Sequence, residues 1–219
     1  MKLIAIAVPC NWAFVPTAFF ASCVQMFSAT QEKYRIMLLV SNSSLIDTMR
    51  ERLADESLKA GADYIMWLDA DQIYPVDTIL RLAEHCENGK FVVGGVTHHK
   101  NDGKPMVWSF GNNYGAGNRE RGFEVGRGLV KVDSMGLGGV MTAREVFDAV
   151  KYPRFVRTWD HDNNNPVGED FCFYARCKER GIDVWCDTDL IYQHMVMYAV
   201  SLNDKAYIDV PSGLGLPKL

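Results

Sequence analysis

The stretch Tyr64-Ile-Met-Trp-Leu-Asp-Ala-Asp71 decides how the chain is interpreted. Residues 64–68 form an apolar run bounded by polar residues, which predicts a strand buried on both faces. Asp69 and Asp71 follow this strand at its carboxyl end, where parallel sheets place their ligands. Two carboxylates there are costly unless a cation or donors compensate them, and a divalent ion shared with substrate phosphates does so. The alternative is a turn or helix-capping pair.

Working outward from this strand, apolar runs and helical periodicities alternate along the first half of the chain. The predicted strands span residues 2–8, 35–40, 64–68 and 91–93, and the predicted helices 16–29, 45–61 and 78–88. This alternation predicts an α/β fold with a mostly parallel central sheet and flanking helices. We expect the first helix, apolar nearly all round, to be well buried, and Asp77 to cap the third.

The second half breaks this rhythm and predicts mixed structure. Residues 111–128 are too rich in glycine for regular structure throughout and predict hairpins or a mobile surface loop. A strand is expected at 129–132 and a last strand at 182–186. Thr142 and Glu145 form a capping box that predicts a helix to about residue 150. A further helix is expected over 169–180.

Composition limits the class of protein. The chain has 219 residues, a net charge of −4, 48% hydrophobic and 23% charged residues, as in ordinary globular domains. These values exclude a disordered chain, a collagen-like fibre and a small disulfide scaffold. The acidic net charge and the absence of a Lys/Arg block argue against a protein that binds nucleic acid through its overall positive charge. The six cysteines are interpreted as reduced and mostly buried. No run reaches the ~20 apolar residues of a membrane span, and prolines interrupt the apolar start, so we expect a soluble cytoplasmic protein.

Other polar clusters are candidates for chemistry. Asp160 and Asp162 either contact a polar acceptor or belong to a solvated loop, which is the favoured interpretation. Asp187 and Asp189 are interpreted as a turn pair. The pair Glu169-Asp170 opens a helix, so either it is a structural N-terminus or it presents a general base. The helix dipole is expected to lower the pKa of that base. His194, beyond the last strand, is either structural or a ligand that completes a carboxylate site, especially for manganese; His98-His99 is a weaker candidate.

Taken in order, these motifs resemble the GT-A-fold glycosyltransferases, close to the family 2 pattern. The matching segments are residues 4–9, 67–71, 132–140, 168–170, 181–185 and His194. The resemblance covers residue 2 to about residue 195. It implies one domain over 1–219, with a nucleotide-binding half at 1–95, an acceptor and catalytic half at 96–198, and a tail at 199–219 that matches nothing.

The resemblance also implies roles. The donor is a nucleotide sugar, such as a UDP- or GDP-sugar, with Mn²⁺ or Mg²⁺. Asp69 and Asp71 match the DxD motif that holds the metal and the nucleotide, and His194 matches an added metal ligand. Asp170 matches the base of inverting members, with Glu169 beside it on the acceptor side. Gly138 and Gly139 match the turn that lines the sugar pocket, and Pro9 and Ser41 lie on the nucleotide side.

The nucleobase of the donor is left open, because Ser41-Asn42 stands where relatives often carry an acidic residue that contacts the nucleotide. The acceptor is open among a glycan, a lipid carrier, a protein and modified nucleic acid. Residues 111–128 are interpreted as a lid that excludes water, or as a hairpin without a catalytic part.

Three alternatives to a glycosyltransferase are kept. They are a magnesium-dependent phosphotransferase of haloacid-dehalogenase type, a sugar nucleotidyltransferase, and a non-catalytic sugar-nucleotide-binding module. The phosphotransferase class also places Asp-x-Asp after a buried strand, but near the N-terminus, whereas two β-α units precede the motif here. The nucleotidyltransferase class is expected to show a glycine- and arginine-rich loop after the first strand, which Cys10-Asn-Trp-Ala does not provide. A binding module would release no nucleoside diphosphate.

Overall fold

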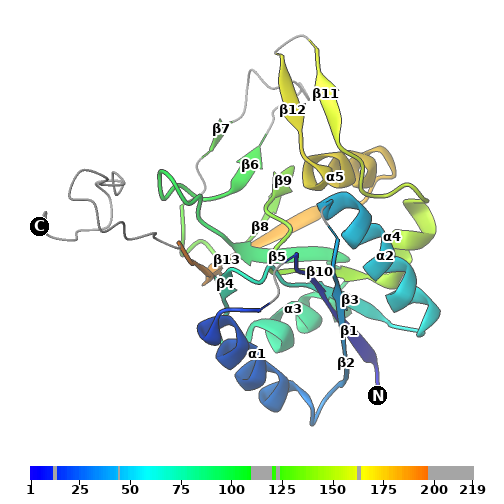
Figure 1. Cartoon of the computed structure of the whole chain (residues 1–219), viewed down its shortest axis with the longest axis vertical. Coiled ribbons are helices and arrows are strands. Elements are labelled where there is room, and N and C mark those ends of the chain that lie inside the picture. The colour runs from blue at the N-terminus through cyan, green and yellow to red at the C-terminus, as the bar shows by residue number, and fades with distance from the viewer. Residues whose placement is uncertain (12–13, 44, 110–119, 122–123, 162–163, 197–219) are drawn as a thin grey trace, which may run out of the picture.

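Figure 1 shows the computed structural model of the chain. It describes residues 1–11, 14–43, 45–109, 120–121, 124–161 and 164–196. Most of the predicted 111–128 loop and the tail from residue 197 onward therefore lie outside the described residues. The lid interpretation and the interpretation of the tail stay predictions.

A seven-stranded sheet forms the centre of the molecule, in the order β2-β1-β3-β10-β5-β13-β8. Its strands are β1 (Leu3–Pro9), β2 (Arg35–Ser41), β3 (Tyr64–Trp67), β5 (Val92–Val96), β8 (Leu129–Val132), β10 (Val140–Ala143) and β13 (Val184–Ile191). Five of the seven run in one direction, and β10 and β8 run against them. The predicted α/β class with a mostly parallel sheet is confirmed.

Strand β10, at the middle of the sheet, was not predicted. It lies between β3 and β5 in the sheet. The predicted capping box at Thr142 is wrong, because Thr142 is a fully buried residue of β10. Its Oγ1 accepts a hydrogen bond of 3.2 Å from the indole N–H of Trp67. Helix α4 (Arg144–Ala149) then begins after Ala143 without a side-chain cap.

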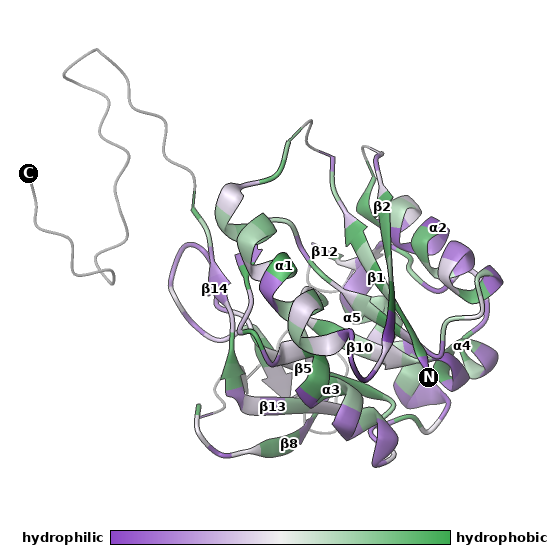
Figure 2. Cartoon of the chain, turned by 90° about the horizontal axis from the view of Figure 1, so that it is seen from below, coloured by the Kyte–Doolittle hydropathy of each residue, from purple (hydrophilic) through white to green (hydrophobic). Residues whose placement is uncertain are grey.

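Helices cover both faces of the sheet (Figures 1 and 2). Helices α1 (Thr17–Thr30) and α3 (Thr78–Glu87) pack on one face, where Met26 and Leu82 join the core around Ile6. Helices α2 (Ile46–Lys59), α4 and α5 (Glu169–Glu179) pack on the other face, where Leu53 and Phe173 join a second core. The molecule is a three-layer α/β/α sandwich.

Two expectations about helices are wrong. Helix α1 is not buried all round, since Phe20 is 60% and Val24 is 50% exposed. The strands beneath it bury only one stripe of a helix, so the rest of its apolar surface faces solvent. Asp77 does precede α3, but its side chain makes no capping hydrogen bond. By contrast, Gly61, Gly89 and Gly181 follow helices as predicted, with φ of 80°, 79° and 70°.

Short antiparallel strands build the mixed second half. They are β4 (Gln72–Ile73) with β14 (Gln193–His194), β6 (Val107–Ser109) with β7 (Glu120–Arg121) and β9 (Ser134–Met135), and β11 (Thr158–Asp160) with β12 (Asn165–Val167). The β11–β12 hairpin projects beside the start of α5 (Figure 1). It places Asp160 in a strand rather than a solvated loop, while Asp162 lies outside the described residues.

Other predictions can be compared directly. Asp187 and Asp189 are not a turn pair, because β13 continues to Ile191 and Asp187 is buried within it. There the Asp187 carboxylate accepts two hydrogen bonds from Arg81, at 2.8 and 2.9 Å, and lies 2.9 Å from His85 Nε2. All six cysteines are free thiols and five are buried, as expected. Among the described helices, none is both long and apolar enough to span a bilayer.

Candidate active site

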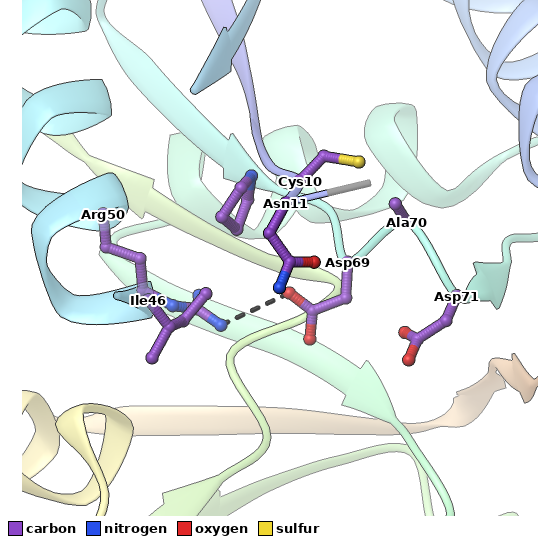
Figure 3. Close-up of a pocket in the computed structure, with 8 residues that line it drawn as sticks. Cys10, Asn11, Ile46, Arg50, Asp69, Ala70 and Asp71 are labelled. Carbon is purple, nitrogen blue, oxygen red and sulfur yellow. Dashed lines mark hydrogen bonds and ion pairs between the residues drawn. The ribbon is translucent and has the colours of Figure 1, made fainter. Parts of the chain in front are cut away.

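A cavity of about 220 Å³ opens where β1 and β3 end and α2 begins (Figure 3). It is lined by Pro9, Cys10, Asn11, Ile46, Arg50, Asp69, Ala70 and Asp71. The register of the sheet explains this position, because Ala7 of β1 lies beside Trp67 of β3, so both strands end at the same edge. This is the carboxyl edge at which the sequence placed its ligand site.

Arg50 connects the two predicted carboxylate motifs. Its Nη2 lies 3.3 Å from Asp69 Oδ1 (Figure 3), and its Nε lies 3.1 Å from Glu169 Oε1. Burial by itself would lower the pKa of this guanidinium, but Asp69 and Glu169 raise it. Arg50 therefore stays charged and holds the end of β3 against the start of α5.

Arg50 was missed from the sequence, although a signal for it exists. Its side chain is only 4% exposed, and it occupies the stripe that otherwise buries Met49, Leu53 and Ala54. An arginine within the apolar stripe of a helix is rare unless it is paired. Its Nη1 has no hydrogen-bond partner among the described residues, so one buried donor of a cavity-lining cation is left for a ligand.

Asp71, the second aspartate after β3, lies next to two basic side chains. Lys100 Nζ is 2.5 Å and His194 Nε2 is 3.5 Å from its Oδ2. The two-residue ladder between β4 and β14 brings His194 here by pairing it with Gln72. Burial would raise the pKa of Asp71, but His194 and Lys100 lower it to about 2, so this carboxylate is permanently ionised at neutral pH.

Asp71 and His194 fit a divalent cation by their chemistry. His194 Nδ1 lies 2.7 Å from the carbonyl oxygen of His98. Nδ1–H donates to this carbonyl, so Nε2 is the nitrogen that faces Asp71. Burial would lower the pKa of His194, but Asp71 raises it and favours a proton on Nε2; a bound cation would take the place of that proton. Asp69, the third predicted ligand, is paired with Arg50, and the described residues contain no group of three close metal-binding side chains.

The predicted sugar-pocket glycines lie against the first aspartate. A Cβ atom on Gly138 would lie 2.4 Å from Asp69 Oδ2, so only glycine lets the chain pass this carboxylate. Gly139 has φ of 87°, and its carbonyl accepts a hydrogen bond of 2.7 Å from the Tyr192 hydroxyl. Thr97 is also close, with its Oγ1 3.4 Å from the Gly138 carbonyl oxygen. The structure thus brings 138–139 to Asp69.

Pro9 and Ser41 are neighbours in the register of β1 and β2. Pro9 lines the cavity. Ser41 is buried, and its Oγ has no hydrogen-bond partner in the part of the chain that the structure describes. The backbone carbonyl of Ser41 accepts a hydrogen bond of 3.0 Å from the Cys10 N–H, which ties the second strand end to the cavity wall.

Asp170 stands at the first turn of α5, next to Glu169. Its Oδ1 accepts a hydrogen bond of 2.8 Å from the Phe171 N–H. Burial, followed by the charge of Glu169, raises the pKa of Asp170 to about 6. The expectation that the helix dipole lowers this pKa is wrong, because desolvation and a like charge outweigh it. A carboxylate with a pKa near 6 is a stronger base than an ordinary aspartate and stays mostly ionised at pH 7.

Three solved structures resemble this chain in fold and indicate its class of protein. One is a structure titled "Crystal Structure of A197 from STIV", with a TM-score of 0.62 and 17% identity. The match covers 90% of this chain and 87% of that protein's chain. A structure of GalNAc-T7 with UDP, GalNAc and Mn²⁺ matches 89% of this chain but only 44% of its own length, at TM-score 0.51 and 10% identity. Apo UDP-glucose pyrophosphorylase matches 88% of this chain and 92% of its own, at TM-score 0.50 and 7% identity.

These likenesses define a GT-A fold. Within it, residues 58–147 match the model of Glycosyl transferase family 2, and the resemblance to family 2-like glycosyltransferases is confirmed. The matched segment contains β3, both aspartates of the DxD motif and Gly138–Gly139. No curated protein matches the sequence.

Proposed function

We propose that this protein is a metal-dependent glycosyltransferase that moves a sugar from a nucleotide-sugar donor to an acceptor hydroxyl by an inverting displacement. The observation that carries the proposal is the link from Asp69 through Arg50 to Glu169 beside the cavity. This link supports the proposal because it joins the strand end that carries Asp69 to the helix start that carries Asp170, a carboxylate with a raised pKa. Such a site combines a place for a charged leaving group with a base for the incoming hydroxyl.

Charge balance supports the need for a divalent ion. Four carboxylates (Asp69, Asp71, Glu169 and Asp170) outnumber three basic side chains, Arg50, Lys100 and His194. The site is therefore short of positive charge before an anionic diphosphate enters. Asp71 and His194, with Asp69 nearby, would hold Mn²⁺ or Mg²⁺, and the ion would supply positive charge for the leaving diphosphate. Arg50 Nη1, which has no acceptor among the described residues, is a second contact for a phosphate oxygen.

The proposed reaction gives each of these side chains a role. The acceptor oxygen attacks the anomeric carbon of the donor sugar, and its proton passes to the Asp170 carboxylate. The new C–O bond forms on the face opposite the breaking bond to the diphosphate, so the configuration inverts. Glu169, fixed by Arg50, stays on the acceptor side of the base, and the turn at Gly138, which packs against Asp69, lines the sugar pocket. The donor is a UDP- or GDP-sugar.

A panel of nucleotide sugars with Mn²⁺ or Mg²⁺ tests the activity. We expect one donor to yield its nucleoside diphosphate and a glycosylated acceptor only with metal. Release of pyrophosphate would indicate a nucleotidyltransferase, which the fold also accommodates. Hydrolysis of a phosphomonoester would indicate the phosphotransferase class, and metal-dependent binding without turnover would indicate a binding module. Each of these results contradicts the proposal.

Asp71→Asn tests the cation site. We expect metal-dependent turnover to be lost while the fold is retained, because the ionised partner of His194 is removed. Asp77→Asn is the matched control, since Asp77 is exposed and makes no cap hydrogen bond. Nucleoside-diphosphate release and circular dichroism measure the two effects. Full manganese-dependent turnover in Asp71→Asn would refute the assignment.

A further inference from the structure

The two edges of the central sheet are built differently. The β8 edge is four residues long and carries Lys131, whose Nζ lies 2.6 Å from Asp183. The β2 edge is seven residues long, with sequence Arg-Ile-Met-Leu-Leu-Val-Ser, and no charged residue follows Arg35 in it. Leu38 and Val40 are 54% and 59% exposed. Natural proteins block long apolar edges with charges, prolines or bulges, and β2 has none of these within the strand.

The free backbone groups and the exposed side chains of β2 belong to the same residues. Arg35 N–H donates to the carbonyl of Lys2, and the carbonyl of Ser41 accepts from Cys10 N–H, so the odd-numbered residues of β2 face β1. Alternation along a strand then directs the N–H and C=O groups of Ile36, Leu38 and Val40 away from the sheet. No other described strand pairs with that side.

Helix α1 continues this apolar surface. Of the helices that the structure describes, α1 alone contains no charged residue. Phe20, Val24, Phe27 and Gln31 follow one stripe at helical spacing, and the last two line a groove against β2. The groove, of about 540 Å³, is also lined by Met1, Tyr34, Arg35, Ile36 and Leu38. In Figure 2, α1 and β2 are mostly green and pale, whereas α2 carries broad purple bands.

We infer that this face is the contact of a homodimer, in which β2 pairs antiparallel with β2 of a second copy about a twofold axis at Leu38. In that register Leu38 faces Leu38, Ile36 faces Val40, and Arg35 faces Ser41, so no like charges meet. The outward backbone groups fall into hydrogen-bonded pairs, giving about six new bonds across the interface. A second copy is the occupant favoured here, because β2 pairs with itself in a register in which its single charged residue, Arg35, meets Ser41, and this suits an isologous interface.

The dimer is independent of the proposed activity, since β2 contributes no side chain to the cavity. Sedimentation velocity tests whether the chain is a dimer in solution. We expect a mass of twice 24.7 kDa for the full chain at micromolar concentration. A monomer at these concentrations would overturn the inference. A monomer that cosediments with lipid vesicles would instead assign the face to a membrane and would overturn it as well.

Introducing a charge at residue 38, which lies on the proposed twofold axis, tests the register of the two strands. Leu38→Lys and Leu38→Glu each place like charges opposite one another, which should raise the dimer dissociation constant at least ~100-fold. Mixing the two variants places Lys opposite Glu and should restore the dimer. Val76→Lys, at a residue 50% exposed near α3, is the matched control and should stay dimeric. Dimers of Leu38→Lys alone, or failure of the mixture to re-form dimers, would refute pairing at Leu38.

Hydrogen exchange gives a readout in the unmodified chain. The amides of Ile36, Leu38 and Val40 should exchange at least ~10-fold more slowly at high than at low protein concentration, because only the dimer bonds them. The amides of Met37 and Leu39 face β1 and should not depend on concentration. Fast exchange at the three outward amides under all conditions would contradict edge pairing, whatever the behaviour of the variants.

Discussion

Two carboxylates of the same cavity region, Asp71 and Asp170, have opposite environments. Asp71 lies beside Lys100 and His194, and these groups lower its pKa to about 2. Asp170 is partly buried next to Glu169, and burial with the like charge raises its pKa to about 6. Identical chemical groups are thus prepared for different tasks: one remains an anion that retains a cation, and the other can exchange a proton near neutral pH.

Arg50 lies between these two regions and keeps them in one site. It is paired with Asp69 of the DxD motif and with Glu169 beside Asp170. The difference teaches that neither region is complete by itself. The strand end supplies carboxylates but no base of raised pKa, and the helix start supplies that base, so the proposed transferase site depends on their connection through Arg50.

The largest effect is expected for Asp170→Asn. An amide cannot accept the proton of the acceptor hydroxyl, so the transfer rate should fall by at least ~10²-fold while donor binding is retained. Transfer is followed by chromatography of the product and donor binding by calorimetry. Asp148→Asn, at an exposed residue of α4, is the control and should behave as the unmodified chain. Retained anomeric configuration in the product would count against Asp170 as the base.

The next effect concerns Arg50→Met. Removing this cation leaves Asp69 and Glu169 without their partner, which should lower the free energy of unfolding by about 3 kcal/mol at pH 7. The loss should be smaller at lower pH, because burial raises the pKa of Asp69 and its protonated form needs no counter-charge. Arg52→Met is the control: Arg52 lies on the same helix with a side chain 65% exposed, and its pair with Glu56 is worth at most ~0.5 kcal/mol. Urea unfolding at both pH values measures the difference. Equal losses in the two variants would show that Arg50 does not join the regions.

The smallest effect is a shift in pH dependence. Asp170 works as a base only when ionised, so the transfer rate should rise about tenfold per pH unit below pH 6 and level off above it. Glu169→Gln removes the neighbouring negative charge that favours protonation, so the midpoint should move to lower pH. Glu179→Gln, at the far end of α5, should leave the midpoint unchanged. A midpoint that does not move in Glu169→Gln would show that Glu169 does not set this pKa.

Much of the fold could be predicted from local patterns. Continuous apolar runs identified β1, β2 and β3, and glycines marked the ends of the helices, because both signals depend on neighbours in the sequence. Strand β10 could not be found in this way. Its residues, Val-Met-Thr-Ala, are short and follow a glycine turn, and their strand character comes from β3 and β5 on either side.

In the candidate site, too, features that depend on sequence neighbours could be predicted, and features that depend on distant residues could not. Asp69 and Asp71 were predicted because they directly follow a buried strand, and the cavity does lie there. Arg50 was missed because its importance depends on Glu169, which is remote in the sequence. The direction of the Asp170 pKa was wrong for a related reason: the dipole of a helix is visible in the sequence, whereas burial of the side chain is not.

The arrangement of the sheet also has a consequence for synthesis of the chain. A ribosome releases the N-terminal strands first, yet β3 and β5 are joined only through β10, which comes from residues 140–143. During translation both strands therefore wait with an open side, a period in which chains are prone to aggregate. His194 emerges later still and meets Asp71 only when β14 pairs with β4. A nascent chain can thus assemble its cavity before Asp71 meets His194, so the cation site that we propose would be complete only after synthesis has passed residue 194.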